Sequence, residues 1–264
     1  MRTRYDAVIL AGGRAPWLKS LAGTDIRSLA KLQDKPLLCY TMDTLRASGR
    51  INNIYVASDT DALAQMAAAG ITGFRPVVCN NMTLAEVVLT AAEAVEADKT
   101  VNHKIFFVCD DVPLLTAEAV NSFLDQCEAK PEGEIYWTVI KKETCEAQFP
   151  EGVRTYGPLS DGKFTGGNVS LLTRNAVAKT QDIARQLYDN RKHPFKLCGL
   201  LGWWLVVRAL FHCLSSSDVE KRCTELMGVE CRAIISEHAC IGMDMDKPKD
   251  WDLVRSKLAG NKIS

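Results

Sequence analysis

The sequence has no excess of charge of either sign, which already excludes some classes of function. Its 264 residues include 32 basic and 32 acidic side chains, so the formal net charge is zero. A general nucleic-acid binder uses a long-range positive field, which this chain lacks, so any phosphate recognition must be local and built into a pocket. We therefore expect no nucleic-acid partner.

Motifs for structural metals, disulfides and secretion are also missing. The 10 cysteines contain no C-x-x-C pair, and the apolar run 7–11 is too short for a signal peptide or a membrane span. The four histidines show no metal-ligand or triad arrangement. We expect reduced, mostly buried thiols in a cytoplasmic protein.

One long apolar segment, 197–214, has nearly the length of a membrane span. It contains Arg208, and an arginine near the middle of a span costs about 2.5–3.5 kcal/mol on insertion scales. We expect a largely buried helix and no transmembrane span. Trp203 and Trp204 are adjacent and cannot both face one core, which leaves open a hydrophobic docking role for this helix.

Short apolar strands alternate with helical patterns through the first half of the chain. This alternation implies right-handed crossovers and a mostly parallel sheet covered on both faces, hence an α/β fold. No internal repeat or linker is visible, so we predict one domain, 1–264. The predicted strands are 7–11, 54–57, 77–78, 104–109, 135–140, 153–156, 168–172 and 231–235, and the predicted helices are 35–47, 59–69, 83–97, 116–127, 175–189, 197–214, 217–227 and 248–258.

Two glycines directly follow the first predicted strand, in the segment VILAGGRAPW. Gly12 and Gly13 let backbone N–H groups approach a bound anion without a Cβ in the way, and Arg14 adds a positive charge beside them. The segment matches neither the dinucleotide-binding fingerprint nor a P-loop. The two glycines are explained either by a phosphate-binding loop or by an ordinary tight turn between a strand and a helix.

Two acidic residues, Asp110 and Asp111, follow the strand 104–109. Open α/β sheets bind ligands at the carboxyl ends of their strands, and adjacent acids there repel each other unless a cation neutralises them. Mg²⁺ held by one or two carboxylates together with substrate phosphates would meet this need. Capping of the following helix by either aspartate is the alternative.

A second acidic pair, Asp244 and Asp246, has a spacing of two residues. Along a strand this spacing sends both carboxylates to one side, toward a metal, while Met243 and Met245 point into the core. The alternative is a solvated strand end in which Asp246 caps the helix that begins at Pro248.

Two further segments offer groups for a second ligand. Gly166 and Gly167 indicate a bulge or a close backbone approach to a ligand, and Asn168 offers both a donor and an acceptor. Lys192 belongs to the basic segment 191–194. This segment could bind an anionic acceptor, or it could be a group of charges exposed to solvent.

In this order, LAGGR, KPLLCYTMDTL, CDDVPLLT, FTGGNVSLL and GMDMDKPKDWDL resemble the MobA-like NTP transferases, which are nucleotidyltransferases with a glycosyltransferase-A type fold. The similarity extends from about Tyr5 to Val254. It implies a three-layer α/β/α fold with a mostly parallel, mixed central sheet, a nucleotide half at about 1–130 and an acceptor half at about 131–264. It also implies that an NTP and a phosphorylated acceptor react to give a nucleotide-linked product and pyrophosphate, with Mg²⁺ as cofactor.

The resemblance also implies which residues form the site. The base lies near Asn81, Thr83 and Glu86. The triphosphate and the rest of the nucleotide are expected at Leu10, Ala11, Gly12, Gly13, Arg14 and Asp110, the metal at Asp111, Asp244 and Asp246, and the acceptor at Gly167 and Asn168, with Lys192 added from its charge.

The lysine that the family has at the head of its K-A-L-x-P-V-x-G-K-P pattern is Arg27 in this chain, and the family proline is Lys31. Arginine keeps a permanent charge and can contact two phosphate oxygens, but it is planar and longer than lysine. Catalytic roles are expected for Arg14, Arg27 and Lys31, with Lys31 or a repositioned Arg27 in place of the lysine.

Two other functions are left open by the sequence. Arg27 is compatible with a nucleotide-binding regulatory protein without turnover, and Asp244 and Asp246 form the D-x-D pair of metal-dependent glycosyltransferases, although near the wrong end of the chain. The nucleotide (CTP, GTP or UTP), the acceptor (molybdopterin, a sugar phosphate or a phosphorylated alcohol) and the oligomeric state are not specified.

Overall fold

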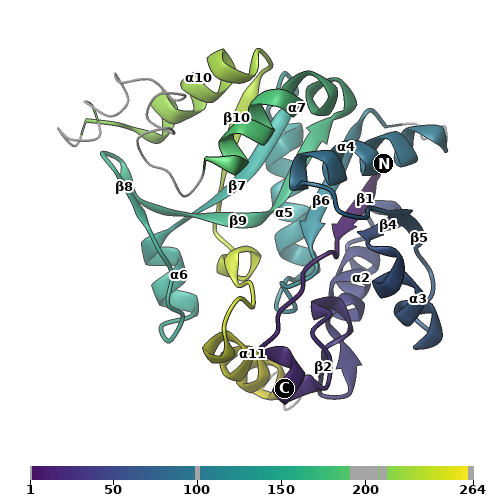
Figure 1. Ribbon diagram of the computed structural model, residues 1–264. Coiled ribbons are helices and arrows are strands. Elements are labelled where there is room, and N and C mark those ends of the chain that lie inside the picture. The colour runs from purple at the N-terminus through teal and green to yellow at the C-terminus, as the bar shows by residue number, and fades with distance from the viewer. Residues whose placement is uncertain (1, 99–101, 191–207, 209–212, 261–264) are drawn as a thin grey trace.

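The computed structural model describes residues 2–98, 102–190, 208 and 213–260 (Figure 1). Most of the apolar segment 197–214, with Trp203 and Trp204, lies outside the described residues, as does Lys192. No helix in the described part of the chain is long and apolar enough to cross a membrane. No disulfide joins two cysteines of the described residues.

The sequence predicts no helix at 18–22 and no strand at 31–32, and it assigns residues 35–36, a short strand in the structure, to the helix 35–47. Otherwise the helices and strands of the first half alternate as predicted. In chain order the elements of the described residues are β1 (Tyr5–Leu10), α1 (Leu18–Ala22), the 3-10 helix η1 (Arg27–Leu29), β2 (Lys31–Leu32), β3 (Lys35–Pro36), α2 (Leu37–Ala47), β4 (Ile51–Ser58), α3 (Thr60–Ala68), β5 (Arg75–Val78), α4 (Leu84–Ala97), β6 (Lys104–Cys109), α5 (Ala117–Glu128), β7 (Ile135–Lys141), α6 (Lys142–Gln148), β8 (Gly157–Leu159), β9 (Gly162–Thr173), α7 (Arg174–Asp189), α10 (Ser216–Met227), β10 (Cys231–Ser236), the 3-10 helix η2 (Ala239–Gly242) and α11 (Pro248–Gly260).

The central sheet is mixed and mostly parallel, as predicted. Its eight strands run in the order β10-β7-β9-β6-β1-β4-β5, with β8 paired to β9. The strands β1, β4, β5 and β6 are mutually parallel, β7 and β10 are parallel to each other, and β9 runs antiparallel to both β6 and β7. A separate two-stranded ribbon, β2–β3, lies outside this sheet.

Helices cover both faces of the sheet and produce three layers (Figure 1). Successive side chains of a strand point to opposite faces, so β1 contributes to two cores. Ala7 and Ile9 share a core with α2, α3, α5 and α11, whereas Val8 shares one with α4 and α7. The run of apolar residues in β1 therefore reflects burial on both faces.

Side-chain caps fix the beginnings of several helices. Asp59, Thr83 and Thr116 accept hydrogen bonds from the backbone N–H three residues on, at the starts of α3, α4 and α5. Thr83 and Glu86 form a reciprocal capping box, as do Ser215 and Asp218 at α10. These local bonds explain why the predicted boundaries agree with the structure to within a few residues.

The second half departs from the sequence prediction in three places. The predicted strand 153–156 is wrong: Val153 is 79% exposed, and the short strand β8 begins only at Gly157, where it pairs back on β9. The predicted strand 168–172 is longer, beginning at Gly162, so Gly166 and Gly167 lie inside β9 and not before it. Helix α6 has no counterpart among the predicted elements.

Hydrogen bonds beyond the strand ends bring several loops to one edge of the sheet. The Ala11 N–H donates to the Ala57 carbonyl (2.9 Å), and the Ser58 hydroxyl donates to the Ala11 carbonyl (2.8 Å). The Asp110 N–H reaches the Leu10 carbonyl at 3.3 Å. The glycine loop after β1 and the aspartates after β6 are therefore neighbours at the carboxyl ends of parallel strands.

Candidate active site

The loop after β1 has one open glycine and one that is closely covered. A Cβ placed on Gly12 would have no atom within 4 Å, whereas one on Gly13 would lie 2.5 Å from Nη2 of Arg27. The Arg27 N–H donates to the Gly13 carbonyl (3.1 Å), which holds the two segments together. A side chain on residue 13 would therefore displace the guanidinium of Arg27, whereas Gly12 leaves space for a ligand.

The guanidinium of Arg27 lies between the aspartates at this edge. Its Nε and Nη2 donate to Oδ1 of Asp110 at 3.1 and 2.9 Å, and its Nη1 is 2.7 Å from Oδ2 of Asp111 and 3.7 Å from Oδ1 of Asp246. The Asp110 side chain is completely buried. In this arrangement the planar fork of arginine neutralises two adjacent buried carboxylates at once.

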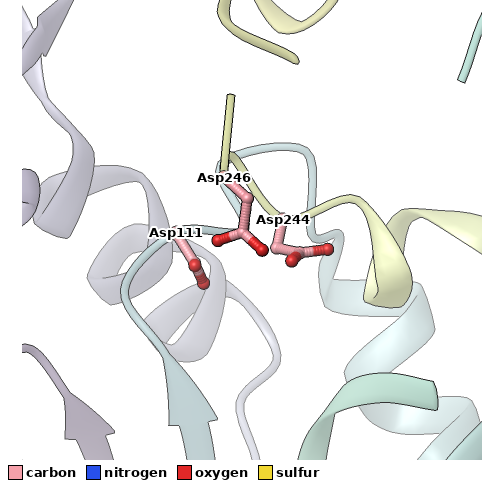
Figure 2. Close-up of side chains that lie close together, drawn as sticks. All are labelled: Asp111, Asp244 and Asp246. Atoms are coloured by element: carbon pink, nitrogen blue, oxygen red, sulfur yellow. The ribbon is translucent and has the colours of Figure 1, made fainter. Parts of the chain in front are cut away.

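Asp111, Asp244 and Asp246 converge although they come from distant parts of the chain. Each offers one carboxylate oxygen, and these three oxygens lie within 4.8 Å of one another. Figure 2 shows their carboxylates gathered at one point, with Asp111 on the loop after β6 and the other two on the segment between η2 and α11. The Met245 N–H donates to the Asp111 carbonyl (3.0 Å) and fixes the two loops side by side.

The alternation predicted around Asp244 and Asp246 is present without a strand. Met243 and Met245 are buried in the main core, while Asp244 is partly exposed and Asp246 exposed. The residues 243–247 form no helix or strand. The side chain of Asp246 does not cap α11; the Asp250 carboxylate accepts the backbone N–H groups of residues 246 and 247 at the start of this helix. The predicted direction of the two carboxylates is therefore found, but the predicted strand is wrong.

The negative charge of the carboxylates in this cluster is only partly neutralised by the basic side chains around them. Burial raises the pKa of Asp111 to about 7; Arg27 acts in the opposite direction, and the charges of Asp110, Asp244 and Asp246 raise it further. Partial desolvation and the neighbouring charge of Asp244 raise the pKa of Asp246 as well, although its side chain is exposed. One buried oxygen of Asp110 (Oδ2) and one of Asp111 (Oδ1) have no hydrogen-bond partner in the described part of the chain.

The donor set fits a divalent cation. Asp244 is ion-paired with Arg154, so the four carboxylates at 110, 111, 244 and 246 face two guanidinium groups, and two negative charges are left. A hard divalent cation prefers carboxylate oxygens, and Mg²⁺ is bound in proteins through one or two of them together with substrate phosphates. Asp111, Asp244 and Asp246 are therefore the residues suited to hold it.

The other two basic residues predicted to be catalytic, Arg14 and Lys31, do not contact the aspartate cluster. Arg14 is paired with Asp59 and Asp61, each at 3.0 Å, and with Asp25 at 3.6 Å, so its guanidinium is engaged on the α3 side of the loop. Lys31 is exposed on the β2–β3 ribbon and has no carboxylate within 4 Å among the described residues. Of the three basic residues predicted to be catalytic, Arg27 is thus the one that the fold places in the aspartate cluster.

Two of the residues predicted to lie near the base, Thr83 and Glu86, form hydrogen bonds or ion pairs within the protein. Thr83 and Glu86 cap α4, and Glu86 also pairs with Arg185 at 2.8 Å. Asn81 is exposed and has a positive φ of 55°, a conformation that asparagine tolerates. Asp110, predicted on the nucleotide side, is covered by the protein and paired with Arg27.

Two residues predicted to contact the acceptor, Gly167 and Asn168, make contacts within the protein. A Cβ on Gly167 would lie 2.8 Å from side-chain atoms of both Thr138 and Ile241, and the Asn168 amide donates to the Ile241 carbonyl (3.2 Å). The close approach predicted at Gly167 is present, but the group that lies against this glycine on one side is η2 of the protein and not a ligand. These residues position the segment that carries Asp244 and Asp246.

Comparison with known proteins identifies the family of this chain. A family model described as the MobA-like NTP transferase domain matches residues 7–194. The chain belongs to the MobA-like NTP transferase family. Asp111 lies within the matched range, whereas Asp244 and Asp246 lie beyond it.

Solved structures of transferases share this fold. A hypothetical transferase from Thermus thermophilus is 30% identical, with a TM-score of 0.79, and the match covers 94% of this chain and 100% of that one. A CMP:2-keto-3-deoxy-manno-octonic acid synthetase complexed with CTP has 13% identity and a TM-score of 0.60 over 98% of this chain and all of its own. A nucleotidyl transferase from Methanothermobacter has 12% identity and a TM-score of 0.57, with the same coverage. No significant match is found among curated proteins.

The sequence gives no indication of one residue of the site, Arg154. It follows Val153 in a stretch without helix or strand and belongs to none of the motifs, yet it is ion-paired with Asp244. Lys247 and Lys249 stand within the motif GMDMDKPKDW, but their types alone suggest only a solvated helix start. Only the folded chain shows that these three residues line one cavity.

Proposed function

We propose that this protein is a Mg²⁺-dependent nucleotidyltransferase that transfers an NMP group from an NTP to a phosphorylated acceptor and releases pyrophosphate. One observation carries the proposal: Asp111, Asp244 and Asp246 offer oxygens within 4.8 Å of one another at the carboxyl edge of the sheet. Arg27, which contacts this cluster, also packs against Gly13 of the open loop after β1. Membership of an NTP transferase family supports it.

The residues at this edge divide into two roles. The backbone N–H groups of the Gly12–Gly13 loop are suited to phosphate oxygens, because Gly12 has no Cβ and nothing within 4 Å of where one would stand. Asp111, Asp244 and Asp246 would hold the cation. When bound, Mg²⁺ supplies charge neutralisation at the triphosphate and Lewis acidity toward its phosphoryl oxygens.

No protein nucleophile is needed for this reaction. A phosphate monoester has its second pKa near 6, so an acceptor phosphate is already ionised near neutral pH and can attack the α-phosphorus in line with the leaving pyrophosphate. The described residues then have to align the two substrates and stabilise the moving charge. Arg27 is placed for the second task, because its permanent charge lies beside Gly13 and the aspartates.

The experiment is pyrophosphate release from CTP, GTP and UTP with a panel of sugar 1-phosphates and other phosphate monoesters, with and without Mg²⁺. We expect release with at least one pair of substrates, dependent on Mg²⁺, and a loss of at least about 100-fold in Asp111→Asn, since an oxygen ligand of the cation becomes a neutral amide. Asp252→Asn is the matched control, because Asp252 is 71% exposed on α11.

The result also separates the alternatives. Mg²⁺-dependent release that Asp111→Asn leaves at the wild-type rate would show that the metal site is elsewhere. Transfer of a sugar from a nucleotide-sugar, without pyrophosphate release from any NTP, would identify a glycosyltransferase.

A further inference from the structure

A cavity of about 420 Å³ adjoins the aspartate cluster and is not used by the nucleotide-side residues described above. Asp244 and Asp246 form part of its wall, and its other polar lining residues include Arg154, Thr155, Thr165, Lys247 and Lys249. Small-molecule sites commonly measure about 300–1,000 Å³, so a phosphorylated metabolite fits this volume. The cavity therefore lies where a second substrate can reach a cation held by the aspartates.

Three basic side chains line this cavity, and two of the acidic ones are already engaged. Glu151 lies 3.5 Å from Lys257, and Oδ2 of Asp250 accepts the N–H groups of Asp246 and Lys247 at 3.1 and 2.9 Å. Within the described residues, neither Lys247 nor Lys249 has a carboxylate within 4 Å. The lining thus keeps positive charge available for an anion.

Arg154 is the basic residue of this cavity in direct contact with the metal cluster. Its side chain is 16% exposed, Nη1 is ion-paired with Asp244, and Nη2 lies 3.8 Å from the Met243 sulfur. A cation on Asp244 competes with this ion pair, since both interact with the same carboxylate. Arg154 then has a free guanidinium fork facing the cavity, and such forks bind phosphate through two hydrogen bonds.

We propose that this cavity binds the phosphate of the acceptor, with Arg154 as its main ligand and Lys247 and Lys249 as supporting charges. The inference rests on the proposed function, because it assumes a cation on the aspartates. Without the cation, four carboxylates and three basic groups give the cavity a net charge of −1; a divalent cation changes it to +1. Acceptor phosphate therefore binds after the cation.

The probes are Mn²⁺, inorganic phosphate and glucose 1-phosphate, used with the full chain. Mn²⁺ binding is followed by EPR, and phosphate binding by the paramagnetic broadening of its ³¹P resonance and by calorimetry. In the wild type we expect phosphate to bind at least about tenfold more tightly with Mn²⁺ than without it, and to lie close enough to Mn²⁺ for its resonance to broaden.

Arg154→Gln is expected to weaken phosphate binding by about 10- to 100-fold, the size of one or two charge-assisted hydrogen bonds, and to leave Mn²⁺ affinity equal or tighter. Arg154→Lys should retain part of the affinity. Arg232→Gln is the control, because Arg232 pairs with Glu132 and Glu230 near the start of β10 and lines no part of the cavity. Thermal unfolding checks that each variant is folded.

Unchanged phosphate affinity in both Arg154 variants, with Mn²⁺ still bound, would overturn this inference and leave the proposed function intact. A loss of phosphate affinity in Arg14→Gln but not in Arg154→Gln would also overturn it, since the phosphate would then occupy the nucleotide side. Failure of the wild type to bind Mn²⁺ would overturn both proposals.

Discussion

At the scale of single residues, Arg27 decides the character of the site. Asp110 and Asp111 are adjacent and buried, and one guanidinium contacts both of them. A lysine ammonium is a compact point charge and lacks this fork geometry. The sequence identified Arg27 only as the occupant of the family lysine position. Its two hydrogen bonds to Oδ1 of Asp110 could not be predicted, because they depend on the backbone contact that brings residue 27 beside Gly13.

Removal of Arg27 should destabilise the cation-free protein. In Arg27→Gln the carboxylate of Asp110 is left buried without its partner, and breaking a buried pair in this way costs about 3–5 kcal/mol. Urea unfolding in EDTA measures the free energy. Arg14→Gln is the matched control: its guanidinium is 40% exposed, and exposed pairs contribute about 0–1 kcal/mol. Equal losses in the two variants would refute the role of Arg27.

The raised pKa of Asp111 predicts pH-dependent cation binding. A metal ligand must be deprotonated, and with a pKa of about 7 this carboxyl keeps its proton in mildly acidic solution when no cation is bound. The apparent Kd for Mn²⁺ should rise by about tenfold for each pH unit below 7 and level off above it. An affinity that stays constant from about pH 5.5 to 8 would mean that an ordinary carboxyl, with a pKa near 4, is the ligand.

The sign of the accompanying stability change follows from the same shift. The folded-state pKa of Asp111 lies above its unfolded value, so the folded protein binds more protons between about pH 4 and 7. This group therefore makes the cation-free fold less stable as the pH rises through that window.

At the scale of the elements, local sequence explains the first half of the chain better than the second. Capping residues such as Thr83 and Thr116 form bonds with N–H groups three residues away, so the starts of α4 and α5 are fixed locally and could be predicted. The position of the segment 243–247 depends on distant partners such as Asp111, whereas the short strand β8 pairs only with the neighbouring start of β9. Val153 is apolar but finds no strand to pair with, and Asp244 and Asp246 alternate with buried methionines without belonging to a sheet.

The contact of β9 with η2 gives a prediction at this scale. In Gly167→Ala the new methyl group would lie 2.8 Å from atoms of Thr138 and Ile241, and overpacking of this kind costs about 1–3 kcal/mol. Because η2 leads into Asp244, Mn²⁺ affinity should fall as well. Gly166→Ala is the adjacent control, since a Cβ there meets nothing within 4 Å. Chemical denaturation and Mn²⁺ titration of both variants test this, and indistinguishable behaviour would contradict it.

At the scale of the whole molecule, the site exists because parallel strands end at one edge. The order of the motifs made the three-layer fold predictable, and the position of Asp111 after β6 follows from it. The approach of Asp244 and Asp246 is a property of the complete fold: β10 and η2 return the chain to that edge, and the Met245 N–H joins the Asp111 carbonyl. Arg154 reaches the same point from an irregular segment, for which no sequence pattern gives a position.

The most direct test of this account is a Mn²⁺ titration of the wild-type protein followed by EPR, in parallel with Asp111→Asn. We expect one bound Mn²⁺ per chain at neutral pH, tighter binding when an NTP is added, and loss of most of this binding in the variant. Absence of a bound ion in the wild type with NTP present, or equal binding by the variant, would contradict it.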